Sequence, residues 1–260
     1  MHQKRWFRSN TANYRQSIPD SHYDGDGKTD RAIYDDSIAT FYVIPSGGGA
    51  GIVHPIGTAN DVSIPIAADY NGDGFTDFVI YDRNLSEFFI DESFGPPTFT
   101  SLFGNPSDVN IPISGDFDGD GKTDIAIYDQ TTAIFRTFSL SGGGSPITVQ
   151  IGTANQGDTP LVGDYNGDGK SDFAVYDPSQ KKFLVSYSTG ASGGASSTLM
   201  TFPSSLPAGD DYVFLTGNYQ GIGLDFAIFD TTTSTFYVYT LGGTLVKTQQ
   251  LGPMGHGIPV

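Results

Sequence analysis

The residues of this chain whose types and spacing could do chemistry are acidic side chains gathered in short glycine-containing loops. Three nine-residue loops share one pattern: Asp or Asn at positions 1, 3, 5 and 9, and Gly at positions 4 and 6. They are Asp69–Asp77 (DYNGDGFTD), Asp116–Asp124 (DFDGDGKTD) and Asp164–Asp172 (DYNGDGKSD). Calcium takes six to eight oxygen ligands in a flexible shell, whereas magnesium requires a stricter octahedron. The three loops therefore predict three calcium sites.

Each loop would supply its side-chain oxygens and the backbone carbonyl of position 7, and the glycines would let these oxygens converge. The predicted ligands are Asp69, Asn71, Asp73, Phe75 and Asp77; Asp116, Asp118, Asp120, Lys122 and Asp124; and Asp164, Asn166, Asp168, Lys170 and Asp172. Carboxylates this close repel one another unless a cation neutralises them. A closed shell of protein oxygens leaves no open position, so we expect the ion to brace the fold rather than to catalyse.

Two further loops are incomplete versions of the pattern. In His22–Asp30 a histidine stands at position 1, and calcium prefers oxygen to nitrogen. Its weaker ligand set is Asp24, Asp26, the carbonyl of Lys28, and Asp30. The loop Asn218–Asp225 lacks most of its carboxylates and one residue. We expect three calcium ions, a fourth at most in the His22 loop, and none at Asn218.

The helical calcium loop of the EF-hand is the obvious competing interpretation. That loop needs a bidentate Glu at position 12 between two helices. Here position 12 is Ile80, Ile127 or Val175, each inside an apolar run. The pattern excludes an EF-hand.

The sequence around each loop predicts four short antiparallel strands. In residues 109–152, Val109–Ser114 precedes the loop, and its Pro112 suits an edge strand. The continuous apolar run Ile125–Tyr128 is typical of a strand covered on both faces. Asp129–Thr132 predicts a turn in which the Asp side chain accepts a bond from the amide two residues on. Strands beginning at Phe135 and spanning Ile147–Ile151 complete the unit.

This unit recurs along the whole chain. The last Asp of the loops falls at residues 30, 77, 124, 172 and 225, in steps of 47, 47, 48 and 53. Four strands in about 45 residues, repeated, are typical of a β-propeller blade. We predict an all-β fold and one propeller domain over residues 1–260. Its five full repeats would be 17–63, 64–110, 111–158, 159–211 and 212–257.

The two ends of the chain suggest a partial sixth blade. Residues 4–16 resemble the third and fourth strands of a blade, and residues 257–260 resemble a first strand. We expect both segments to share one incomplete blade. Its exposed edge could pair with another copy of the chain.

Composition narrows the classes of partner. The chain has 260 residues, a net charge of -16 and no cysteine. This charge argues against nucleic acid and anionic membrane surfaces as partners, and the absence of cysteine excludes disulfides. No apolar run reaches transmembrane length, and no signal peptide is visible behind the basic start.

The segment Ile111–Tyr128 (IPISGDFDGDGKTDIAIY) resembles the FG-GAP/VCBS repeats of extracellular bacterial proteins, and similar calcium loops occur in the propeller of integrin α-subunits. The resemblance extends over about residues 17–260. It implies a propeller with calcium between the first and second strands of a blade. It also implies an extracellular or cell-surface location.

Catalytic patterns are weak by comparison. His54 and His256 have no Ser, Cys or acidic residue at suggestive spacing, and Ser192 lies in a Gly/Ser-rich stretch without the helix of a nucleophile elbow. The recurrent Phe41, Phe88, Phe135, Phe183 and Phe236 suit packing between blades better than a carbohydrate-stacking platform. We therefore predict a non-catalytic adhesion or recognition module for a protein or glycan. A polysaccharide-active enzyme of the lyase type and a structural spacer remain the alternatives.

Overall fold

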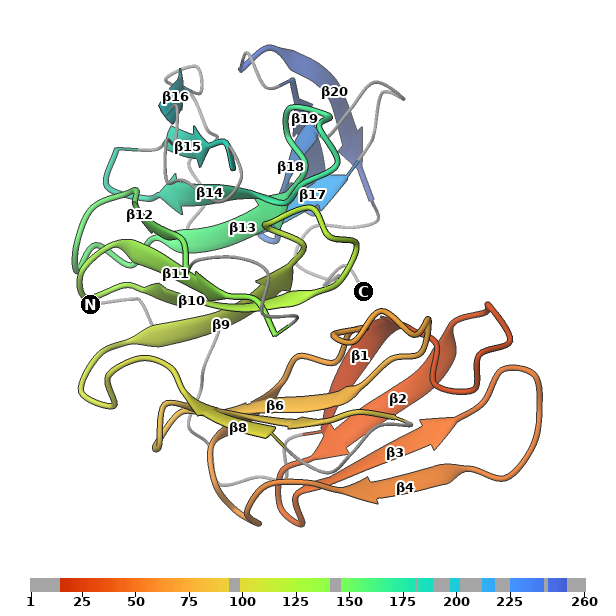
Figure 1. Cartoon of the computed structure of the whole chain (residues 1–260). Coiled ribbons are helices and arrows are strands. Elements are labelled where there is room, and N and C mark those ends of the chain that lie inside the picture. Colours follow the sequence, from red (N-terminus) through yellow and green to blue (C-terminus); the bar gives the residue numbers. More distant parts are fainter. Residues whose placement is uncertain are drawn as a thin grey trace. The chain divides into compact units, whose positions relative to one another are not determined.

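The computed structural model describes residues 15–93, 99–140, 146–180, 182–188, 197–201, 212–217, 225–240 and 243–251. Within these ranges the chain forms twenty β-strands and no helix (Figure 1). The strands make five four-stranded antiparallel sheets, each from four strands consecutive in sequence. This confirms the prediction of an all-β chain built from repeated four-stranded units. No described helix could span a membrane.

The strand bounds follow the repeats. The first sheet holds β1 (Arg15–Ser21), β2 (Asp30–Asp35), β3 (Thr40–Ile44) and β4 (Ile52–Pro55). The second holds β5 (Ser63–Pro65), β6 (Phe78–Asp82), β7 (Glu87–Asp91) and β8 (Phe99–Leu102). The third holds β9 (Asn110–Gly115), β10 (Asp124–Asp129), β11 (Ile134–Phe138) and β12 (Thr148–Gln150). The fourth holds β13 (Thr159–Gly163), β14 (Asp172–Asp177), β15 (Lys182–Ser186) and β16 (Ser197–Thr201). The fifth holds β17 (Tyr212–Gly217), β18 (Asp225–Asp230), β19 (Thr235–Tyr239) and β20 (Leu245–Gln250).

The described residues fall into two compact units, and the division runs through the third sheet. One unit takes the described parts of residues 1–114, 120–131 and 137–144. The other takes those of 115–119, 132–136 and 145–260.

In the second, third and fourth sheets the second strand is the most buried of the strands whose side chains the structure describes. Every residue of β6, β10 and β14 is buried, as expected for continuous apolar runs covered on both faces. Pro112 lies in β9, at the edge of its sheet, where a missing N–H is tolerated. The sequence pattern therefore placed the inner and edge strands correctly.

An aspartate closes each second strand and organises the turn that follows. The carboxylate of Asp35 accepts a hydrogen bond from the amide of Ser37 at 3.1 Å, and that of Asp129 accepts one from Thr131 at 2.9 Å. The equivalent bonds run from Asn84 to Asp82, from Ser179 to Asp177 and from Thr232 to Asp230. The predicted turn geometry is thus confirmed in all five repeats.

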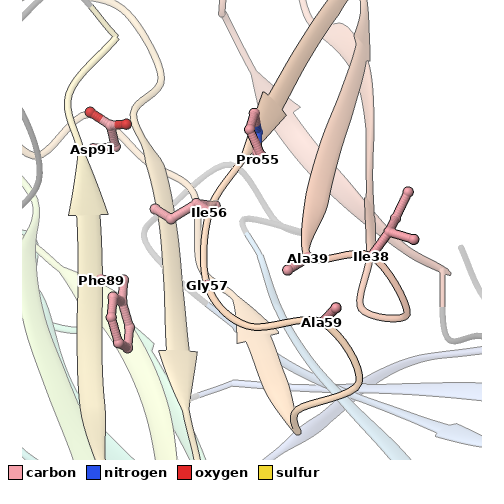
Figure 2. A pocket seen from close by; sticks show the side chains of 8 residues that line it. All are labelled: Ile38, Ala39, Pro55, Ile56, Gly57, Ala59, Phe89 and Asp91. Atoms are coloured by element: carbon pink, nitrogen blue, oxygen red, sulfur yellow. The ribbon is translucent and has the colours of Figure 1, made fainter.

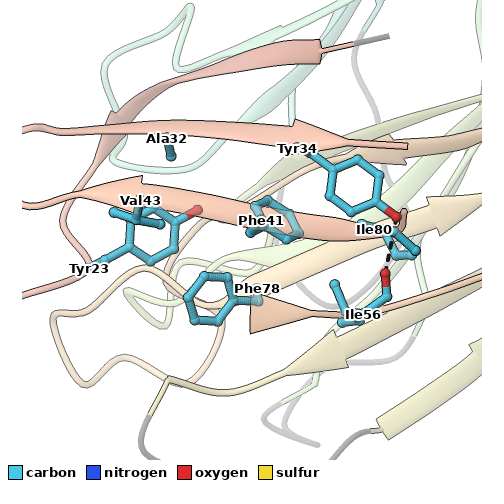
Figure 3. Packing of buried hydrophobic residues seen from close by; sticks show 9 residues of the cluster. Tyr23, Ala32, Tyr34, Phe41, Val43, Ile56, Phe78 and Ile80 are labelled. Carbon is cyan, nitrogen blue, oxygen red and sulfur yellow. Dashed lines mark hydrogen bonds between the residues drawn. The ribbon is translucent and has the colours of Figure 1, made fainter. Parts of the chain in front are cut away.

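The third-strand phenylalanines are core residues. Phe41, Phe88, Phe135 and Phe183 are fully buried. Rings of the following repeat pack against them: Phe78 lies 5.4 Å from Phe41, Phe173 lies 5.3 Å from Phe135, and Phe226 lies 4.4 Å from Phe183, between ring centroids. Figure 3 shows this packing for the cluster around Phe41 and Phe78. Packing between repeats is confirmed for these rings, and Phe236 is only half-buried.

Two boundaries differ from the prediction. The third strands begin one residue before the predicted phenylalanine, because the residue before it already pairs with the second strand, as Thr40 does with Asp35. Arg15 and Gln16, expected in a further blade, pair with Asp35 and Tyr34 and so belong to β1. The rest of that blade, residues 4–14 and 257–260, lies outside the described residues.

Candidate metal sites

The acidic loops lie where the sequence predicted them. The loops that begin at His22, Asp69, Asp116 and Asp164 each connect the first strand of a sheet to the second. Residues 218–224 of the fifth loop, where no ion is expected, lie outside the described residues, and only its last residue, Asp225, is placed, at the start of β18.

The first carboxylate of a complete loop sits at the centre of its turn. Asp69 Oδ1 accepts a hydrogen bond from the amide of Gly72 at 2.6 Å, and its Oδ2 accepts one from Gly74 at 2.9 Å. Asp164 makes the same bonds with Gly167 and Gly169. The glycines at positions 4 and 6 have φ between 74° and 87° in all four described loops, a region that favours glycine. The backbone thereby wraps around the carboxylate.

The third and fifth positions are held close together. Asn71 Nδ2 donates to Asp73 Oδ2 at 3.1 Å, and Asp73 Oδ1 accepts from the amide of Phe75 at 2.9 Å. Asn166, Asp168 and Lys170 repeat this arrangement with the same distances. The Asn71 amide nitrogen thus faces the Asp73 carboxylate, and the Asn71 amide oxygen accepts from the amide of Asp73 at 2.8 Å.

The ninth aspartate ties the loop to the end of the third strand. Asp77 is fully buried; its Oδ2 accepts from the amide of Tyr70 and its Oδ1 from the amide of Ser93, both at 2.9 Å. The pKa of Asp77 is raised to about 6: burial is the largest cause, the hydrogen bonds from Ser93 and Tyr70 lower the pKa, and the charges of Asp73 and Asp69 raise it. Burial likewise raises the pKa of Asp172. Without a cation the loop therefore carries unfavourable charge.

The donor atoms fit a hard cation. Carboxylate oxygens of Asp116, Asp118 and Asp120 lie within 4.8 Å of one another. Oxygens of Asp24, Asp26 and Asp30 form a second such group. His22 lies outside that group, and its backbone amide donates to Thr76 Oγ1 at 2.7 Å. The oxygen donors and glycine turns suit calcium.

In the His22 loop a lysine competes with a metal for one carboxylate. Lys28 Nζ lies 3.2 Å from Asp26 Oδ2, and the Lys28 amide donates to Asp26 Oδ1 at 2.8 Å. The amide bond is the largest cause of the lowered pKa of Asp26. In the complete loops the position-7 lysines, Lys122 and Lys170, lie against the preceding loop.

A backbone hydrogen bond links each loop to the next. The amide of Thr76 donates to the carbonyl of His22 at 3.0 Å. The amides of Thr123 and Ser171 donate to the carbonyls of Asp69 and Asp116 at 3.0 and 2.6 Å. In the described loops, position 8 of each later loop therefore bonds position 1 of the loop before it.

The side chain at position 7 covers the preceding loop as well. A Cβ on Gly25 would lie 2.2 Å from the ring of Phe75, and one on Gly72 would lie 3.0 Å from Lys122 Cγ. Lys170 covers Gly119 in the same way and donates from Nζ to the carbonyl of Asp118 at 2.9 Å. Sequence reasoning assigned position 7 only a carbonyl ligand. The contact was missed because it joins residues about 50 positions apart.

His54 also has a partner that the sequence analysis missed. Its Nε2 lies 2.9 Å from Asp91 Oδ2, and its ring stacks on Phe78 at 4.0 Å between centroids and 7° between planes. The expectation that no acidic residue accompanies His54 is wrong, because the β3–β4 and β6–β7 hairpins bring together residues 37 positions apart. His256 and Ser192 lie outside the described residues.

Comparison with known families identifies the repeat. Residues 116–175, which contain the loops that begin at Asp116 and Asp164, match the family model of the FG-GAP-like repeat. This confirms the resemblance seen in the sequence. No curated protein matches the chain by sequence.

Several solved structures with a similar fold align with nearly the whole chain. One describes specific recognition of non-reducing terminal N-acetylglucosamine by a lectin of Agrocybe aegerita; its TM-score is 0.64 at 16% identity, over 92% of this chain and 66% of the lectin. A streptogramin B lyase gives 0.59 at 10% identity, over 93% of this chain and 74% of the lyase. BBS1N in complex with ARL6DN gives 0.53 at 10% identity, over 92% of this chain and 69% of that one. At such identities the likeness shows a propeller-like fold alone, and the chain spans about two thirds of the lectin's length.

Proposed function

We propose that this chain, whose residues 116–175 form an FG-GAP-like repeat, is a calcium-braced propeller domain that recognises a protein or glycan partner outside the cell. The observation that carries the proposal is the series of acidic loops, each bonded through its backbone to the next. A metal that stiffens one loop thereby stiffens its neighbour.

Three loops would hold calcium, and the His22 loop would be a fourth, weaker site. In each complete loop the side chains of positions 1, 3, 5 and 9 and the carbonyl of position 7 would supply the oxygens. The bound ion would neutralise the carboxylates of Asp69 and Asp73, whose charges raise the pKa of Asp77. The chain's own contribution is to hold these oxygens on a glycine-containing turn.

A recognition role follows from the regularity of the repeats. The side chains that repeat most strictly are buried between repeats or held in the loops, so they serve the scaffold. Binding specificity would then reside in the positions that vary between repeats. Two of the similar structures are of a lectin that recognises a sugar and of a protein bound to a second protein. They support recognition as a use of this fold.

The proposal includes one domain over residues 1–260, with five complete blades and a sixth shared by the two ends of the chain. It also includes the absence of catalysis. The Asp116, Asp118 and Asp120 carboxylates form part of a ligand set that the protein itself can close.

A binding screen with the whole chain tests the function. The protein, in saturating calcium and in excess chelator, is applied to a glycan array and to immobilised extracellular proteins. We expect at least one partner, bound more tightly in calcium. Turnover of a polysaccharide would overturn the non-catalytic assignment. Absence of any partner in either condition would favour a structural spacer.

A further inference from the structure

A cavity of about 470 Å³ opens between the first two repeats. It is lined by Ile38, Ala39, Pro55, Ile56, Gly57, Ala59, Phe89 and Asp91. Figure 2 shows Phe89 and Asp91 on one strand, β7, facing Ile56 of the segment that follows β4. A volume of this size is ordinary for a binding site of a small group.

The repeats themselves serve as an internal comparison for this cavity. His54 stands opposite the third-strand phenylalanine of its sheet, where the other repeats have Ser101, Val149, Met200 and Gln249. Asp91 stands three residues after the third-strand phenylalanine of its own repeat, where the others have Ile44, Phe138, Ser186 and Tyr239. No other repeat has a histidine or an acidic residue at these positions; here the two side chains bond each other, and Asp91 lines the cavity. A scaffold role alone would not require this pair.

The pair fixes a carboxylate at the wall of the cavity. The His54 ring is held by its stack on Phe78 and bonds Asp91 Oδ2. Asp91 Oδ1 makes no hydrogen bond within the described part of the chain, and about a quarter of the Asp91 side chain is exposed. One carboxylate oxygen thus stays available to accept bonds from a ligand.

The chemistry of the lining selects the ligand class. Among the eight lining side chains, Asp91 is the one polar group, and it can only accept hydrogen bonds when ionised. The Ala39 carbonyl is taken by the Ile56 amide and the Ile56 carbonyl by Tyr34 Oη, and Pro55 has no N–H. A sugar, whose hydroxyls both donate and accept, would find no side-chain donor in this lining. A cation on an apolar stem would pair with the carboxylate and lie against the aromatic and aliphatic walls.

We propose that this cavity binds a lysine or arginine side chain presented by a protein partner. The inference rests on the proposed recognition function and narrows it to a partner with a basic surface. The net charge of -16 attracts such a partner before contact. Phe89 supplies the ring, and His54 acts as a positioning residue that orients Asp91.

Amide NMR of the calcium-loaded full chain tests the proposal with small probes. Nα-acetyl-lysine methylamide and Nα-acetyl-arginine methylamide should shift the amides of Ala39, Ile56 and Phe89. The uncharged Nα-acetyl-norleucine methylamide and N-acetylglucosamine should not. Shifts caused equally by lysine and norleucine probes would overturn the role of the carboxylate, and shifts by the sugar alone would overturn the cation.

Matched variants locate the effect. Asp91→Asn should weaken binding of both cationic probes about tenfold or more. Glu92→Gln removes the same charge from the next residue, which does not line the cavity, and should leave binding unchanged. Phe89→Leu should weaken the arginine probe about two- to fivefold. The spectrum of each variant without probe shows whether that variant folds. The comparison of probes on the wild-type protein does not depend on the variants.

The outcomes separate this inference from the proposed function. A partner found in the binding screen that is unaffected by Asp91→Asn would refute the cavity as its site and leave the recognition function intact. Absence of probe binding to the wild type would refute the cavity whatever the screen finds.

Discussion

Replacing Asp73 with asparagine should have opposite effects on stability with and without calcium. The side chain is exposed, and Asn would keep the oxygen that accepts from the Phe75 amide. The substitution removes a carboxylate from the proposed ligand set and also removes a charge that raises the pKa of Asp77. Calcium affinity should therefore fall, while the metal-free loop loses a repulsion.

The magnitudes follow from linkage. At a calcium concentration a hundred times Kd, one site contributes about 2.7 kcal/mol to the free energy of unfolding. A ten- to hundredfold weaker site would contribute about 1.4 to 0.4 kcal/mol, a loss of about 1.3 to 2.3 kcal/mol. For a chain of this size that lowers Tm by about 3 to 9 °C. In excess chelator the relieved repulsion should raise Tm, by no more than about 2 °C.

Scanning calorimetry of wild type and Asp73→Asn, each in calcium and in chelator, measures both changes. Asp108→Asn is the matched control, because it removes one negative charge outside the acidic loops and should act equally in both conditions. An equal drop in Tm for Asp73→Asn in calcium and in chelator would show that Asp73 serves the fold and not a metal.

Three further changes test other parts of the structure. Gly25→Ala should lower the free energy of unfolding by about 1 to 3 kcal/mol more than Gly27→Ala does, because both glycines have a φ of 74° but only a Cβ on Gly25 would meet the Phe75 ring. Equal losses measured by chemical denaturation would refute the contact between the loops. Asp61→Asn should raise Tm by about 1 to 3 °C at neutral pH. Burial raises the pKa of Asp36, and the charge of Asp61 also raises it, so the folded state holds the Asp36 proton more tightly than the unfolded state does. Stability therefore falls as pH rises above about 4, and the rise in Tm caused by Asp61→Asn should vanish toward pH 4. A rise in Tm that does not depend on pH would contradict this reasoning. Native mass spectrometry should count three calcium ions, or four if the His22 loop binds, and two or fewer would show that the ligand sets are misassigned.

Local features were predictable from the sequence because they depend on neighbouring residues. The turn of Asp129 needs only the amide of Thr131, and the loop of Asp69 needs only the two glycines that follow it. The continuous apolar run of β10 likewise revealed a strand buried on both faces. In these cases residue type and spacing determine the geometry.

Features that join different repeats were not predictable from a single repeat. The contact of Phe75 with Gly25 and the hydrogen bond between His54 and Asp91 depend on how one sheet packs against the next. A comparison among the repeats supplies a signal for the pair, because no other repeat has a histidine or an acidic residue at these two positions. The same comparison gives no signal for position 7, where Phe75, Lys122 and Lys170 differ in type but occupy the same place.

Among the four described loops, the bond from position 8 of one loop to position 1 of the preceding loop gives neighbouring repeats complementary ends. Each unit offers a carbonyl to its successor and an amide to its predecessor, as His22 and Thr76 do. A gene segment of about 47 codons could therefore be duplicated or excised in frame. The repeats that become neighbours would already carry the amide and the carbonyl that bond each other. Growth and shrinkage of such arrays during evolution, or by design, would then require no newly invented interface. A length change inside an acidic loop would instead misalign its joint, so we expect length variation among related chains to concentrate in the hairpin between the third and fourth strands.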